Sequence, residues 1–138
     1  MVVNRRITLN TRGNGHIADI TEEVRREISG AGLRNGLVTL FTPSSSSALT
    51  TAEYESGVVD DLQELFDRLL PPNMDYRHNL RWGDGNGHAH ARHALLGPSL
   101  TIPLVEGRLT LGTWQQIIFL DFDNRARSRS LVVQILGE

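Results

Sequence analysis

The sequence predicts a single α+β domain of mostly antiparallel sheets packed as a sandwich, with two to three helices. Three observations predict this class: segments with β-type patterning outnumber helical ones, one strongly periodic helix lies mid-chain, and short turns separate the last three β-type segments. The 138 residues match the size of one domain and contain no linker, so we expect residues 1–138 to form one unit.

The first part of the chain predicts a strand followed by a helix. Residues 2–10, VVNRRITLN, alternate well enough to be a strand. Asp19 followed by Glu22 has the pattern of a capping box, in which the first side chain and the fourth close the start of a helix. We therefore expect a helix over roughly residues 20–30.

The middle of the chain predicts a buried strand, a second β-like segment and the clearest helix. Residues 36–43, GLVTLFTP, form a short apolar run typical of a buried strand, and residues 44–55 read as a polar hinge and then a β-like segment. Apolar side chains recur at three- and four-residue spacings over 58–70, which predicts a helix that a Pro-Pro pair ends. Residues 73–87 are polar and glycine-rich, and we expect them to be irregular.

The last part of the chain predicts a short helix and three strands. HARHALLG, residues 90–97, looks like a short helix with a glycine at its C-terminal end. The turns Glu106-Gly107 and Asp123-Asn124 suggest that the strands form an antiparallel meander, with Trp114 and Gln115 inside a buried strand. The predicted strands cover residues 99–105, 108–122 and 128–137.

The composition excludes several kinds of chemistry. The chain has no cysteine, which excludes thiolate nucleophiles and thiolate zinc sites. All 14 basic residues are arginines, so lysine Schiff bases are excluded while bidentate recognition of phosphate stays open. The net charge of −2 argues against a nucleic-acid partner. No apolar run could span a bilayer and the N-terminal residues lack a signal peptide's apolar stretch, so we expect a cytoplasmic protein without a membrane partner.

Three of the five histidines, His88, His90 and His93, fall within six positions. In an extended segment, His88 and His90 would point to the same side and could offer two imidazoles together. If a helix begins near residue 88, His90 and His93 share a face instead. The residues alone leave both alternatives open.

These histidines suggest a metal site with ligands from elsewhere in the chain. His78 lies in the same polar region, and Glu53 or Asp84 could add a carboxylate, which gives a mixed set suited to zinc or another divalent ion. The alternative is that all of them are exposed loop and helix-start residues.

Other segments have the chemistry to hold an anion. Ser44 to Ser47 could present hydroxyls and backbone N–H groups to a phosphate, although a solvated hinge is the alternative. Arg125, Arg127 and Arg129 alternate after a turn and could hold a phosphate, or could line a solvated strand edge.

Residues 84–123, DGNGHAHARHALLGPSLTIPLVEGRLTLGTWQQIIFLDFD, resemble the core of the YjbQ-like family of small uncharacterised proteins. The shared steps are Asp-Gly-Asn leading to Ala-His, then Leu-Leu-Gly, Gly-Arg-Leu and the more specific Leu-Gly-Thr-Trp-Gln. The resemblance extends over essentially the whole chain. It implies an α+β sandwich assembled as a homotrimer, with sites near subunit boundaries. It also implies a weak thiamine-phosphate-synthase-like activity, which joins a pyrimidine pyrophosphate to a thiazole phosphate and releases pyrophosphate.

The resemblance also ranks individual residues. It implies Glu53, His90 and Gln115 as catalytic residues, with His78 beside them. Many members have His-Thr-Ser-Ala where this chain has four serines, so His88 is a candidate replacement for the missing histidine. The remaining candidates, for substrate binding, are Ser45, Ser46, Asp61 and Arg127.

Together these observations predict a metal-dependent enzyme acting on a phosphorylated small molecule. His78, His88 and His90 would hold a divalent metal, zinc first, with Glu53 as ligand or general base and an arginine on the phosphate. The alternatives are a non-catalytic trimer that binds a metal or a metabolite phosphate, and a structural oligomer.

Overall fold

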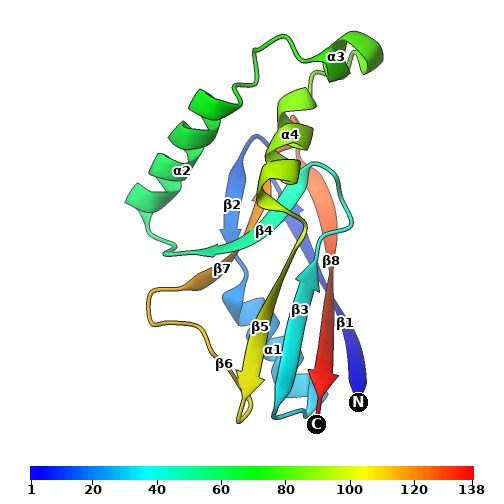
Figure 1. Ribbon diagram of the computed structural model, residues 1–138, viewed down its shortest axis with the longest axis vertical. Helices are drawn as coiled ribbons and strands as arrows, with labels where there is room; N and C mark the ends of the chain where they lie inside the picture. Colours follow the sequence, from blue (N-terminus) through cyan, green and yellow to red (C-terminus); the bar gives the residue numbers. More distant parts are fainter.

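The computed structural model describes residues 1–138, which form two antiparallel sheets and four helices (Figure 1). The large sheet has the strand order β1-β8-β3-β5-β6 and the small sheet has the order β2-β7-β4. In chain order the elements are β1 (Val2–Thr11), β2 (His16–Asp19), α1 (Thr21–Ala31), β3 (Gly36–Phe41), β4 (Ser47–Ala52), α2 (Ser56–Leu69), α3 (Arg77–Trp82), α4 (Gly87–Leu96), β5 (Ser99–Val105), β6 (Arg108–Leu109), β7 (Gln116–Asp121) and β8 (Arg127–Gly137).

The two sheets and the helices stack in layers around β7. Ile117 and Phe119 point into a core shared with the large sheet and α1, while Ile118 and Leu120 point into a second core shared with α2 and α4. All four side chains are at most 1% exposed, because β7 is covered on both faces. The predicted α+β class and sandwich are therefore confirmed, with one more helix than expected.

The predicted strand over 108–122 is wrong as a single element. It is divided into β6, which pairs with β5 in the large sheet, and β7, which lies between β2 and β4 in the small sheet. The loop between them leaves Trp114 73% exposed rather than buried. The meander is confirmed only at its first turn, where β5 and β6 pair across Glu106-Gly107. It is wrong at the second, because β8 pairs with β1 and β3 and not with β7. The sequence pattern does not reveal this arrangement. The continuous apolar run of β7 shows that both faces of the strand are covered, but not which strands lie beside it.

Three helices were predicted and one was not. α1, α2 and α4 are present, and α3 lies inside the stretch expected to be irregular. The predicted capping box is not formed, because the residue before α1 is Ile20, which has no side-chain cap. Asp19 Oδ1 instead accepts from Thr21 N at 3.0 Å and Thr21 Oγ1 at 2.6 Å, and Glu22 pairs with Arg25 at 2.6 Å. None of the helices is both long enough and apolar enough to cross a membrane.

Candidate functional site

Helix α4 begins at Gly87, so the histidine segment is helical rather than extended. His90 and His93 consequently share one face, and each donates from Nδ1 to a backbone carbonyl of the serine segment: Ser45 O at 2.8 Å and Ser47 O at 2.6 Å. His88, two residues before His90, points away from that face and is 3% exposed, with its ring centroid 6.4 Å from that of Tyr76. The helical period therefore separates His88 from His90.

His78, on α3, comes next to His90. Their ring centroids are 4.5 Å apart, with the rings tilted by 48°. His78 Nδ1 lies 3.5 Å from Asp84 Oδ1 and 3.4 Å from Asn79 Oδ1. Two of the three predicted metal ligands are thus neighbours, and the carboxylate candidate Asp84 is beside one of them. We call His78, His90 and Asp84 the imidazole site.

The hydrogen bonds determine which ring nitrogens are free. A carbonyl oxygen can only accept, so Nδ1 of His90 carries a proton, and the neutral ring has its lone pair on Nε2. A histidine that binds a metal through one ring nitrogen usually donates a hydrogen bond from the other to a carbonyl or carboxylate, which orients the ring. The chain nevertheless brings no three His, Asp or Glu side chains close enough together to enclose a metal. What the chain does bring together is the pair of imidazoles of His78 and His90, with Asp84 Oδ1 3.5 Å from His78 Nδ1.

His88 has a different environment. Its Nδ1 is buried without a hydrogen-bond partner. Burial, and secondly the positive charge of Arg92, lower the pKa of its imidazole. The structure thus makes His88 a neutral, enclosed ring that does not reach the imidazole site.

Beneath the serine segment lies a buried ionic network that sequence reasoning missed. Asp121 and Asp123 are 0% and 1% exposed. Asp121 accepts from Arg129 Nε at 2.8 Å and Nη2 at 2.9 Å, and Asp123 accepts from Arg127 Nε at 2.8 Å. Arg129 Nη2 also donates to Ser46 Oγ at 3.0 Å, which ties the network to the segment that carries the His90 partner.

Asp123 also reaches the start of α4. Asn86, the residue before the helix, donates from Nδ2 to Asp123 Oδ1 at 3.2 Å. Burial alone would raise the pKa of the Asp123 carboxyl, but the bonds from Asn86 and Arg127 outweigh it and lower the pKa to about 2. The alternating Asp-Phe-Asp that begins with the last residue of β7 is the only sequence signal for this pair of buried acids.

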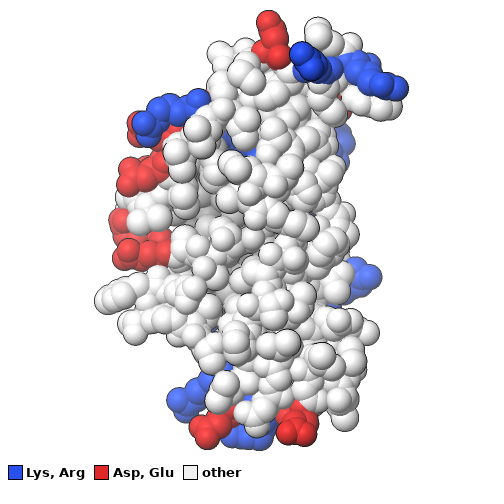
Figure 2. Space-filling model, in the orientation of Figure 1, with Lys and Arg blue, Asp and Glu red and all other residues white.

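The network changes the role of Arg127. Its guanidinium is 2.6 Å from Asp123, so its charge is already balanced inside the protein. Arg77 and Arg81, on α3 with His78, have no such acid partner; Arg81 lies over the Trp82 ring instead, at 5.7 Å. Figure 2 shows arginine side chains at the α3 end of the molecule. Unlike Arg127, these two arginines of α3 carry a charge that no acid of the chain balances.

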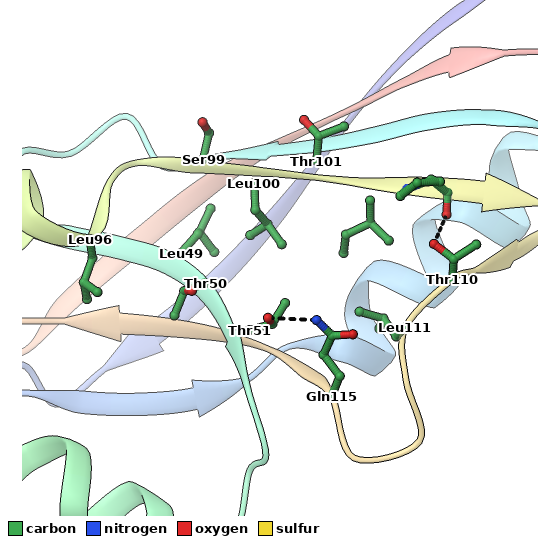
Figure 3. A pocket seen from close by; sticks show the side chains of 12 residues that line it. Leu49, Thr50, Thr51, Leu96, Ser99, Leu100, Thr101, Thr110, Leu111 and Gln115 are labelled. Carbon is green, nitrogen blue, oxygen red and sulfur yellow. Dashed lines mark hydrogen bonds between the residues drawn. The ribbon is translucent and has the colours of Figure 1, made fainter.

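The other predicted site residues lie elsewhere in the chain's fold. Glu53 follows the last residue of β4 and is exposed, and Asp61 is exposed on α2. Gln115 lines a pocket of about 380 Å³ between β4 and β5, where its Nε2 donates to Thr51 Oγ1 at 3.0 Å (Figure 3). About 13 Å of strand separates Ser47, the His93 partner, from Thr51. Within one copy, Glu53 and Gln115 are therefore remote from His90.

The fold and the site together describe a small α+β sandwich protein with a pair of neighbouring imidazoles at its surface. The chain belongs to the family described as UPF0047 protein YjbQ-like, whose model matches residues 5–138. This match confirms the family resemblance of the sequence.

Relatives and solved structures agree with the family over nearly the full chain. A UPF0047 protein of Archaeoglobus fulgidus is 39% identical over 130 residues, covering 94% of this chain and 98% of the relative. A hypothetical protein of Aeropyrum pernix K1 has a TM-score of 0.92 at 34% identity, with 99% of both chains covered. A protein of unknown function from Sulfolobus solfataricus P2, described as YbjQ-like, has a TM-score of 0.90 at 29% identity, with 100% of both chains covered.

Proposed function

We propose that this protein is a metal-dependent enzyme acting on a phosphorylated small molecule at the imidazole site. The carrying observation is the 4.5 Å approach of the His78 and His90 rings, with His90 Nδ1 bonded to the Ser45 carbonyl at 2.8 Å. This bond leaves the His90 Nε2 lone pair available as a ligand. Two imidazoles favour zinc among the divalent ions. When bound, the ion would neutralise phosphate charge and activate water.

The chain's own residues would bind and orient the substrate. His78 and His90 would occupy two coordination positions of the ion, and its other positions would be open to phosphate oxygens or water. Arg77 and Arg81, which have no acid partner, supply positive charge on the same helix as His78. Ser45 orients His90, and Ser46 links that segment to Arg129 at 3.0 Å. The buried network thereby holds the serine segment against α4.

The homotrimer, the cytoplasmic location and the weak thiamine-phosphate-synthase-like activity form part of the same proposal. Glu53 and Gln115 are remote from His90 within one copy, and an assembly in which sites lie at subunit boundaries offers a way to bring them together. The outer face of the large sheet carries exposed apolar side chains that a neighbouring copy would cover; among them are Leu37, Phe41 and Leu136.

The alternative is a non-catalytic trimer that binds a metal or a metabolite phosphate. The position of Glu53 favours it, because this candidate general base is exposed and remote from His90 within one copy. The one carboxylate beside the imidazoles, Asp84, is already engaged with His78 Nδ1 at 3.5 Å. A binding protein needs the ligands and the arginines but no general base.

Turnover separates the two functions. Protein purified without a histidine tag would be assayed with zinc on a phosphomonoester and on the two thiamine precursors. The enzyme proposal expects turnover that a chelator removes, that His90→Ala lowers at least a hundredfold, and that His93→Gln largely keeps. His93 is the matched control because it makes the same kind of carbonyl bond on the same helix face. Equal background rates in wild type and His90→Ala would refute catalysis at this site.

A further inference from the structure

A second polar pocket lies on the other side of α4 from His90. It has a volume of about 180 Å³, is lined by α2, α4 and the turn between β1 and β2, and opens to solvent. Its lining residues are Asn14, Gly15, Gln63, Phe66, Asp67 and Arg92. This pocket shares no residue with the imidazole site and does not depend on a metal.

The pocket contains a buried cation with one free nitrogen. The Arg92 side chain is 4% exposed, and its guanidinium carbon lies 5.7 Å and 5.5 Å from the centroids of the Phe66 and Phe122 rings. Nε and Nη2 donate to Leu70 O at 3.2 Å and 2.8 Å, and Nη2 also donates to Asp67 Oδ1 at 3.1 Å. Nη1 has no hydrogen bond within the chain.

Gly15 leaves space beside this free nitrogen. Its φ is +83°, and a Cβ built on it would lie 4.0 Å from Arg92 Nη1. Any larger residue here would be strained and would narrow the approach to the guanidinium. The turn thus keeps open a donor that a carboxylate oxygen would satisfy with a charge-assisted hydrogen bond.

The same pocket also offers acceptors. Asp67 bonds Arg92 through Oδ1 only, so Oδ2 has no partner in the chain. Gln63 donates from Nε2 to Gly15 O at 3.1 Å, which leaves its Oε1 without one. Asp67 would repel a ligand that carries only a negative charge, and Arg92 would repel a ligand that carries only a positive charge. The arrangement therefore fits a molecule that carries both charges close together.

The volume of the pocket suits a small molecule. At about 30 Å³ for each water, the pocket holds roughly six waters, which matches a compound of about six non-hydrogen atoms. We infer that this pocket binds a small zwitterionic α-amino acid of the size of glycine or alanine. Its carboxylate bonds Arg92 Nη1, and its ammonium group bonds Asp67 and the Gln63 oxygen.

Titration calorimetry of the wild-type protein with glycine, alanine, acetate and methylammonium tests this inference. Glycine or alanine binds saturably, whereas acetate and methylammonium, each with one of the two charges, bind at least tenfold more weakly. Asp67→Asn keeps an oxygen that accepts from Arg92 but removes the negative charge that attracts the ligand's ammonium group. This variant therefore binds the amino acid at least tenfold more weakly. Asp60→Asn, an exposed change on the same helix, leaves binding unaltered.

Thermal unfolding of each variant shows whether it is folded; the Asp67 side chain is 64% exposed, and the asparagine oxygen can still accept from Arg92 Nη2. The inference is overturned if neither amino acid binds at millimolar concentration. It is also overturned if acetate binds as well as glycine, or if folded Asp67→Asn binds glycine as tightly as wild type.

Discussion

Asp123 shows how single buried charges organise this protein. Its carboxylate is 1% exposed and takes hydrogen bonds from Arg127, Asn86 and the backbone of Asn124. Arg127 belongs to β8, and Asn86 precedes α4. One carboxylate thereby connects the end of β7 in the small sheet, the start of α4 and the start of β8 in the large sheet.

The lowered pKa of Asp123 predicts a defined pH dependence of stability. The folded pKa is about 2 against an ordinary value of 3.8, so the carboxylate's contribution is present above pH 3.8 and is lost as the pH falls toward 2. That difference corresponds to about 2 kcal/mol. Urea unfolding should show Asp123→Asn less stable than wild type by at least this amount at pH 7, with the gap narrowing below pH 3.8. A gap that stays constant down to pH 2 would contradict the charge-based explanation.

At the scale of elements, the strand and helix periods were readable from the sequence, whereas sheet membership was not. α2 was predicted because its apolar side chains follow the helical period. The break between β6 and β7 was missed because residues 110–115 carry no strong turn signal, and partners distant in sequence decide which sheet a strand joins. α3 was missed because it is six residues long and buries none of its residues.

The turn between β1 and β2 offers an element-scale prediction. Gly13 has a φ of +67°, and a Cβ there would lie 2.1 Å from Arg125 O. Gly13→Ala should therefore lose about 2 kcal/mol or more of unfolding free energy, because the left-handed backbone and the clash both oppose it. Gly30→Ala, in α1 with nothing within 4 Å of its Cβ, should be neutral or stabilising. Chemical unfolding of both variants measures this, and equal stabilities would contradict the close packing of the turn.

At the scale of the whole molecule, the candidate site was only partly predictable. The sequence pointed to His78 and His90, which the fold brings together, but it also grouped them with His88, Glu53 and Gln115, which the fold separates. His88 is separated from His90 because residues two apart on a helix point in different directions. Gln115 is separated from it by the length of β4. The buried acids Asp121 and Asp123 were missed because their function depends on arginines from a strand whose position the sequence does not specify.

The central claim is that His78 and His90 together bind a divalent metal. The most direct measurement is zinc binding by titration calorimetry and native mass spectrometry, with wild type, His78→Ala, His90→Ala and His93→Gln, all free of affinity tags. The account predicts stoichiometric zinc on wild type and His93→Gln, and at least tenfold weaker binding for each of the other two variants. Absence of zinc binding by wild type, or equal binding by His90→Ala, would contradict it.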